Sequence, residues 1–320
     1  MRYRFWFFAF LILGAAVQAS GAQERDWPSR PVTIVNLFGA GGNADVASRA
    51  LAQALSEKFG QSFVVENRPG GGGVVGTAYV AKAKPDGYTL LTTSIGPAAL
   101  NQLLFKSVPY DTDRDFTPVI VLGDVPNVIV SSPQLGLKTL SDLAAYGKSH
   151  PGGLNFGHAG VGSMGHLGAT LFATKAGVKA TYVAYRSPGA VVTDVLSGQI
   201  QAGTPTFIPA VQTVTALAVM AEQRMEIQPD IPTARESGFD VVAVSWIGLL
   251  APAGLPDKIR DQLNAAINDY LKSDTGRLAF NKANVRPIGG TPGQMAETIK
   301  KDRALWAPII AKENIQLEPN

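Results

Sequence analysis

The hydrophobic positions along this chain alternate between two periods, one typical of strands and one typical of helices. Segment 32–38 is a short run rich in β-branched residues and predicts a strand. In segment 45–59 apolar residues recur at every fourth position, which predicts an amphipathic helix. The same alternation predicts further strands at 62–66, 88–93, 154–157, 181–184 and 214–220, and helices at 74–84, 140–148, 164–176, 190–196, 257–271 and 291–310. Strands interleaved with helices indicate an α/β fold with helical layers around a mostly parallel sheet.

Two stretches of the chain predict crossings between two domains. The first, 119–130, is rich in β-branched residues and is broken by a Gly-Asp-Val-Pro sequence, and the second, 241–250, leads back. Two crossings make a molecule of two lobes with a cleft between them. We therefore expect one lobe to comprise 23–125 and 241–320, and the other to comprise 126–240. The 320 residues suffice for two domains, at roughly 100–200 residues per domain.

The N-terminus has the features of a secretory signal peptide. Two arginines precede an apolar run at 5–17, and small residues follow at 18–22. The apolar run is shorter than the roughly 20 residues that a membrane-spanning helix needs. Cleavage after Ala19 or after Ala22 fits the pattern, and we favour Ala22, which makes 1–22 the leader. The sequence therefore predicts an exported, soluble protein of a Gram-negative periplasm.

Composition excludes several classes of protein. The chain has no Cys, which excludes a disulfide scaffold, a cysteine nucleophile and thiolate metal sites. Its three His are not clustered as in zinc hydrolases, and we expect no metal and no cofactor. Removal of the leader lowers the basic residues from 28 to 26 against 25 acidic ones, a net charge of +1. Without a basic run, nucleic acid is not an expected partner.

A Gly-rich loop at 39–45 follows the first predicted strand and precedes a helix. It satisfies the loose dinucleotide-binding pattern Gly-x-Gly-x-x-Ala, and Glu66 ends the next strand. Two arguments oppose that interpretation: an exported protein meets little NAD, and Asp45 would lie near the pyrophosphate. The loop still leaves the first N–H groups of a helix free to bind an anion such as a carboxylate. Asp45 either caps the helix or accepts a hydrogen bond from a ligand.

A second loop of the same kind lies at 158–166. Ser163 stands at the helix N-cap, and Val161 replaces the Gly that an esterase elbow requires. Ser163 is either a plain cap or a ligand contact, and His166 is either a packing residue or a ligand contact. Two helix N-termini that face each other across a cleft can hold a small anion. Thr93 and Ser94, at the end of a strand, add hydroxyl groups at the same sheet edge.

An ordered set of short motifs carries a resemblance over essentially the whole mature chain. The motifs lie at 27–31, 38–45, 65–71, 84–90, 109–116, 160–166, 230–233 and 248–254. In this order they resemble the Bug family of periplasmic solute receptors, the binding subunits of tripartite tricarboxylate transporters. The resemblance implies a two-lobed periplasmic binding protein fold of double-crossover (type II) topology with the ligand cleft between the lobes. It also implies a non-catalytic receptor that closes on a small carboxylate (a di- or tricarboxylate, an acidic amino acid or an aromatic acid) through backbone amides and ordered water.

The resemblance assigns ligand-binding positions in four segments. By position these are Phe38, Gly41, Gly42, Asp45, Thr93, Ser94, Ala159, Gly162, Ser163, His166, Thr204 and Pro205. The chain departs from the family at Gly39-Ala40, where Pro-Pro is usual, and at 203–206, where an Asp is common. The stretch from there to Leu217 is also shorter than usual. The missing carboxylate favours a ligand without an amino group.

Other functions stay open at this point. The receptor delivers its ligand either to permease subunits or to a membrane sensor, and nothing in the sequence requires more than a monomer. An exported enzyme on the same fold would have Asp45, Glu66 and His166 as its candidate acids and bases. A dehydrogenase with an apolar N-terminus is a third class.

Overall fold

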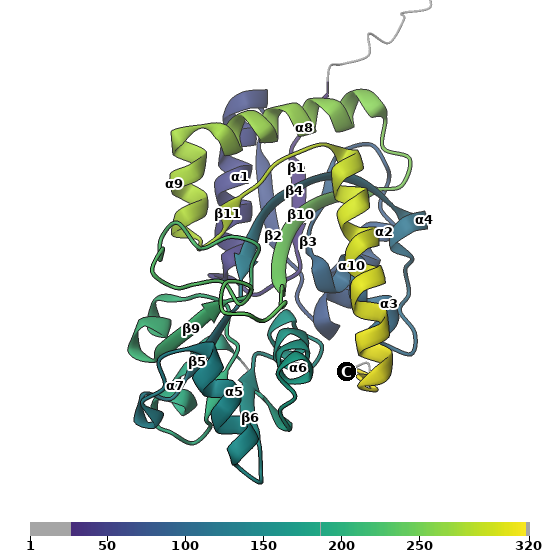
Figure 1. The fold of residues 1–320 in the computed structure, drawn as a ribbon. Helices are drawn as coiled ribbons and strands as arrows, with labels where there is room; N and C mark the ends of the chain where they lie inside the picture. Colours follow the sequence, from purple (N-terminus) through teal and green to yellow (C-terminus); the bar gives the residue numbers. More distant parts are fainter. Residues whose placement is uncertain (1–26, 186, 318–320) are drawn as a thin grey trace, which may run out of the picture.

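The computed structural model describes residues 27–185 and 187–317, so the predicted signal peptide lies outside the described residues. Two sheets, each covered by helices, form the two halves of the molecule (Figure 1). The first sheet has six strands in the order β11-β4-β10-β3-β1-β2. Its strands are β1 (Val32–Asn36), β2 (Phe63–Asn67), β3 (Thr89–Ser94), β4 (Phe116–Pro126), β10 (Val244–Pro252) and β11 (Arg286–Pro287).

Helices cover both faces of the first sheet. One core forms under α1 (Asn43–Phe59), α8 (Asp257–Lys272) and α9 (Asp274–Lys282). The opposite face is covered by α2 (Val74–Ala81), α3 (Asn101–Leu104) and α10 (Pro292–Lys312). Shorter segments are the 3-10 helix Gly71–Gly73, the π-helix Gly96–Leu100 and α4 (Thr112–Asp115). Burial of apolar side chains on both faces makes this sheet the centre of a three-layered unit.

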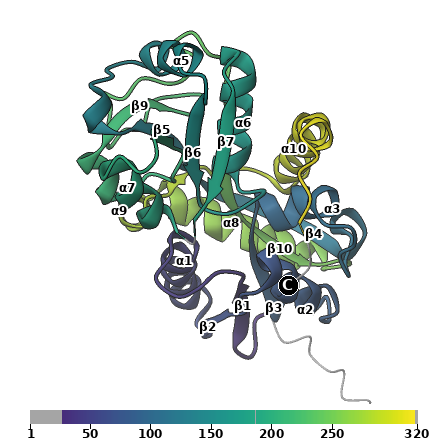
Figure 2. The same cartoon turned by 90° about the horizontal axis from the view of Figure 1, so that it is seen from below.

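The second sheet has five strands in the order β7-β6-β8-β5-β9. Helices α5 and α6 lie on one side of it and α7 lies on the other (Figure 2). Its elements are β5 (Val128–Ser131), α5 (Leu140–Ser149), β6 (Leu154–His158), α6 (Met164–Ala176), β7 (Ala180–Ala184), α7 (Pro188–Leu196), β8 (Ala202–Gly203) and β9 (Thr215–Val219), with 3-10 helices at Pro133–Leu135 and Pro209–Thr213.

The chain passes between the sheets at two places that lie side by side. Asn127 alone separates β4 from β5, and the segment after β9 returns to β10. Asn127 is 2% exposed, and its Nδ2 donates to the carbonyl of Ala243, 3.1 Å away. Its own carbonyl accepts from Met220 N at 2.8 Å. The two crossings are therefore joined by hydrogen bonds at the boundary between the sheets.

Most of the predicted elements are confirmed within a few residues, and most strands of each sheet run in one direction, as predicted, with β10 and β11 reversed in the first sheet and β5 reversed in the second. Pairs β1–β2, β1–β3, β6–β7 and β6–β8 are parallel, whereas β10 runs antiparallel to both β3 and β4. The reason is topological: β4 leaves the first sheet and β10 re-enters it, so the two run in opposite directions. The periodicity did not reveal α9, β11 or the helical segment that spans Gly96–Leu104.

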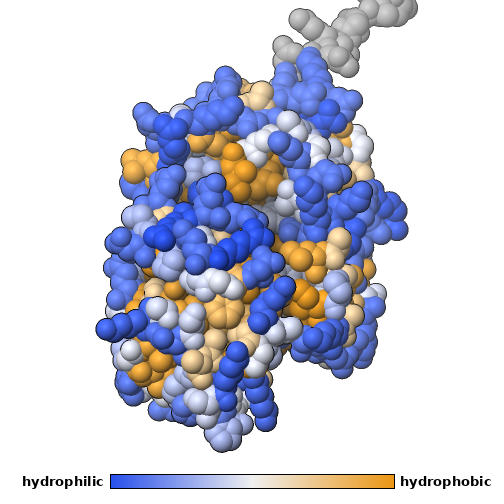
Figure 3. Space-filling view, in the orientation of Figure 1, coloured by the Kyte–Doolittle hydropathy of each residue, from blue (hydrophilic) through white to orange (hydrophobic). Residues whose placement is uncertain are grey.

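The surface agrees with the amphipathic pattern of the helices. The face seen in Figure 3 is largely hydrophilic, and hydrophobic residues show as patches among the hydrophilic ones. Within 27–185 and 187–317, no helix combines the length and the apolar character that crossing a membrane requires.

Candidate functional site

A cavity of about 320 Å³ receives side chains from both sheets and from the crossings between them. The loop after β1 and the start of α1 form one wall, and the loop after β6 and the start of α6 form another. Strand β10 contributes the floor with Ser245, Trp246 and Ile247. Six of the residues predicted from the sequence line this cavity: Phe38, Gly42, Ser94, Ala159, Ser163 and Thr204.

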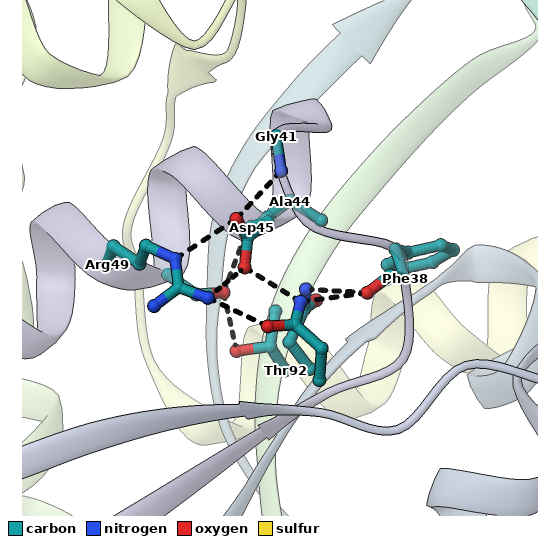
Figure 4. Close-up of polar contacts among 9 residues, drawn as sticks. Phe38, Gly41, Ala44, Asp45, Arg49 and Thr92 are labelled. Carbon is teal, nitrogen blue, oxygen red and sulfur yellow. Dashed lines mark hydrogen bonds and ion pairs between the residues drawn. The ribbon is translucent and has the colours of Figure 1, made fainter.

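The loop before α1 is held in shape by Asp45, as Figure 4 shows. Asp45 is only 3% exposed, and its carboxylate accepts from Gly41 N at 2.9 Å and from Asn67 Nδ2 at 2.8 Å. Arg49 donates to both carboxylate oxygens, at 3.1 and 2.9 Å. Asn67 Nδ2 also donates to the carbonyl of Phe38 at 2.9 Å. These contacts fix the backbone between Phe38 and the start of the helix.

The electrostatic state of Asp45 follows from these donors. Burial by itself raises the pKa of the carboxyl group, but the hydrogen bonds from Arg49, Gly41 and Asn67 outweigh it and lower the pKa below its ordinary value. Asp45 is therefore an anion whose charge is met by Arg49. Gly41 and Asp45 are not among the residues that line the cavity.

The loop before α6 is held by two histidines. His166 Nδ1 accepts from Gly162 N at 3.1 Å, and His158 Nδ1 donates to the carbonyl of Gly160 at 2.7 Å. Ser163 caps the helix, with its Oγ accepting from His166 N at 3.2 Å. Burial, reinforced by repulsion from His158, lowers the pKa of His166 to about 4. Gly162 and His166 lie behind the cavity wall, and Ser163 forms part of it.

The remaining predicted residues divide between the cavity and the core. Thr93 is fully buried, whereas its neighbour Ser94 lines the cavity. Thr204 Oγ1 donates to the carbonyl of Gly165 at 2.8 Å and so joins the second sheet to α6. Pro205 lies outside the cavity lining, and its carbonyl accepts from Val128 N at 2.9 Å.

Strand β10 contributes residues that the sequence interpretation missed. Trp246 is 5% exposed and lines the cavity, and its Nε1 donates to Asp302 Oδ2 of α10 at 2.7 Å. Burial raises the pKa of Asp302 to about 6, and the indole hydrogen bond opposes this only in part. The sequence assigned this stretch to the return crossing. Because a crossing strand lies at the boundary between the sheets, this assignment could have predicted that the strand also borders the site.

Comparison with known proteins decides the family. The model of the tripartite tricarboxylate transporter family receptor, TctC, matches residues 47–315. The chain belongs to this family. The chain is similar to BugT from Bordetella pertussis, with 34% identity over 315 residues that cover 96% of this chain and 97% of BugT.

Solved structures of similar proteins share the fold over most of the chain. The R. palustris protein Rpa4515, solved with adipate, is 35% identical with a TM-score of 0.79, covering 89% of this chain and 98% of that one. MatC from Rhodopseudomonas palustris, solved with bound malate, is 31% identical with a TM-score of 0.75, covering 88% and 99%. The two-sheet architecture of this TctC receptor is thus the periplasmic solute-binding fold.

TctC proteins are receptors, and the candidate acids and bases of an enzyme are dispersed in this member. Asp45 is paired with Arg49, Glu66 with Arg68 at 2.7 Å, and His166 with Gly162. None of the three lines the cavity. Among residues 27–185 and 187–317, no group of three or more His, Asp or Glu side chains is arranged to hold a metal ion.

Proposed function

We propose that this protein is a non-catalytic periplasmic receptor that captures a small carboxylate in the cavity and delivers it to a permease of the tripartite tricarboxylate type. One observation carries the proposal: the first turns of α1 and α6, which belong to different sheets, both line one cavity. The relatives solved with adipate and with malate support a carboxylate as the ligand.

Backbone amides supply the anion-binding groups in this proposal. The N–H groups of Asn43, Ala44, Met164 and Gly165 lie in first helical turns, where an α-helix offers them no acceptor of its own. Helices of 17 and 13 residues add the positive ends of their dipoles. Such a site stabilises a carboxylate without an arginine. Ser94 and Ser163 contribute the hydroxyl groups of the binding site that we propose.

The proposed receptor consists of two lobes, 23–125 with 241–320 and 126–240, and the leader 1–22 exports it. The distribution of strands between the two sheets and the crossings at Asn127 support this division. A ligand that touches both lobes binds the closed state more tightly and shifts the population toward it.

The other walls of the cavity indicate the chemical character of the rest of the proposed ligand. Phe38, Trp246 and Ile247 offer an apolar surface for a hydrocarbon body. Thr204 and Thr206 line the side where related proteins commonly carry an Asp, so we propose a ligand without an ammonium group.

The proposal is tested on mature protein isolated from the periplasm. Denaturation followed by mass spectrometry is expected to release one stoichiometric carboxylate, and calorimetric titration with adipate, malate and that molecule gives the affinities. The double variant Ser94→Ala/Ser163→Ala is expected to bind the released carboxylate more than tenfold more weakly. Ser273→Ala removes a matched N-cap hydroxyl from α9, outside the cavity, and should leave affinity unchanged. Absence of binding to every carboxylate tried would overturn the proposal.

A further inference from the structure

The two loops of the cavity are built on the same hydrogen-bonding plan. In each, a glycine with positive φ donates its N–H to the side chain four residues later: Gly41 (φ 82°) to Asp45 Oδ2 at 2.9 Å, and Gly162 (φ 74°) to His166 Nδ1 at 3.1 Å. Both acceptors stand at the third position of their helix. Both acceptor atoms are bonded to Cγ, so a carboxylate and an imidazole reach equally far.

The two acceptors differ in charge. Asp45 is anionic, and Arg49, one helical turn later, donates to both of its oxygens. The equivalent position after His166 is Thr170, which carries no charge. The N–H of Gly162 points to Nδ1 of His166, so this nitrogen is unprotonated and the ring is neutral. The second loop is thus braced by an acceptor that needs no counter-ion.

A second ring fixes the first. His158, 1% exposed, stacks on His166 with ring centroids 4.3 Å apart, and Tyr182 packs edge-on against His166 at 5.0 Å. His158 Nδ1 must be protonated because it donates to the carbonyl of Gly160. His158, protonated at Nδ1, therefore holds the first residue of 160–162, and His166, unprotonated at Nδ1, holds the last. This loop leads directly into Ser163 at the cavity.

We infer that His166 is a positioning residue of the carboxylate site, a neutral acceptor that fixes the second loop without adding negative charge beside the bound anion. The inference rests on the proposed function and deepens it. An acidic residue here would make the same hydrogen bond, but its charge would cancel part of the positive potential at the N-terminus of α6 and repel the ligand. Asp45 avoids this conflict because Arg49 neutralises it.

The hydrogen bond from Gly162 N to His166 Nδ1 is tested without any ligand. The chain has three His, and His150→Asn leaves two of them for assignment in long-range ¹H–¹⁵N spectra of ¹⁵N-histidine-labelled protein. We expect His158 protonated at Nδ1 and His166 protonated only at Nε2. A proton on Nδ1 of His166 overturns the inference, since that atom could not accept from Gly162.

The electrostatic part is tested by three variants titrated with adipate. His166→Asn keeps a neutral acceptor on Cγ and is expected to bind within about threefold of wild type. His166→Leu removes the acceptor and His166→Asp makes it anionic, and each should weaken binding more than tenfold. Asn and Asp are nearly isosteric, so the difference in affinity between these two variants measures the effect of the negative charge. Thermal unfolding confirms that each variant is folded.

The outcomes separate this inference from the proposed function. Wild-type affinity in the Leu or the Asp variant overturns the positioning role of His166. Wild-type protein could show the expected tautomers and yet bind neither adipate nor malate, nor any carboxylate released from it. In that case the proposed function is wrong, while the hydrogen bond from Gly162 to His166 stands. The electrostatic role for His166 is then wrong as well.

Discussion

Two carboxyl groups, that of buried Asp45 and that of half-buried Asp302, contact cavity walls without lining the cavity themselves. Asp45 ties Gly41, Asn67 and Arg49 into one network, and Asp302 holds the indole of Trp246. Neither carboxyl lines the cavity. Their effects on ligand affinity are therefore effects on the shape of the walls.

Replacing Asp45 by Ala removes the charged acceptor that Gly41, Asn67 and Arg49 share. We expect the free energy of unfolding to fall by roughly 1–3 kcal/mol and affinity for the carboxylate to fall several-fold, measured by denaturation and by calorimetry. Asp142 is a matched control, because it also stands at the third position of a helix and accepts from the N–H four residues earlier, Lys138 N, outside the cavity. Asp142→Ala should leave affinity unchanged, and an equal loss in both variants would contradict a local effect.

Asp302 predicts a dependence of stability on pH. Its pKa is raised to about 6 in the folded protein, so the folded state binds this proton more tightly than the unfolded chain does. The contribution of Asp302 to the free energy of unfolding therefore falls as pH rises from about 4 to about 6 and stays low above that range.

Asp302→Asn keeps an acceptor for Trp246 but cannot ionise. We expect the variant to exceed wild type in free energy of unfolding by roughly 1–3 kcal/mol at neutral pH, with the difference closing as pH falls toward 4. Urea denaturation at a series of pH values measures this. A difference that stays constant with pH would show that ionisation of Asp302 is not its cause.

At the scale of elements, the amphipathic helices were predictable because their buried positions repeat with the helical period. The loops at 39–45 and 158–166 were also predictable, because a strand, glycines and a helix follow one another in the sequence. The directions of the side chains were not predictable from the sequence. Asp45 and His166 lie inside the motifs, but neither side chain lines the cavity. Trp246 and Ser245 were missed because a largely buried crossing strand cannot be distinguished from ordinary core in a single sequence.

Close packing of α6 on the second sheet gives a prediction for that element. A Cβ on Gly165 would lie 2.3 Å from the carbonyl oxygen of Thr204, and both residues line the cavity. Gly165→Ala must push the helix from the strand end, so we expect a loss of about 1–3 kcal/mol in the free energy of unfolding and weaker ligand binding.

Gly189 supplies the matched control for Gly165. It occupies the same second position of its helix, α7, and its nearest neighbour to a new Cβ is 3.9 Å away. Gly189→Ala should leave stability unchanged or raise it by up to about 1 kcal/mol. If both alanines behave alike under denaturation and titration, contact with Thr204 is not the reason for the effect.

At the scale of the whole molecule, the proposed closure requires the two proposed lobes to rotate about the crossings, which Asn127 and Ala243 join by a hydrogen bond. Because the chain has no Cys, spin labels attach only where Cys is introduced. Exposed Lys58 of α1 and Lys175 of α6 place one label on each proposed lobe. Electron–electron double resonance is expected to show a shorter distance when saturating ligand is added.

A pair of labels within one lobe controls for local effects. Lys58 and exposed Lys282 of α9 both belong to the unit built on the first sheet, and their distance should not change. A cross-lobe distribution that is the same with and without ligand would refute closure as the capture step.

The placement of Trp246 has a practical consequence. Its indole borders the cavity, whereas Trp27 packs among aromatic rings and Trp306 is 1% exposed. A ligand that displaces water from the indole of Trp246 changes the polarity around this tryptophan and leaves the surroundings of Trp27 and Trp306 as they were. We therefore expect the intrinsic tryptophan fluorescence to change when ligand occupies the cavity. Binding could then be followed optically without an attached dye.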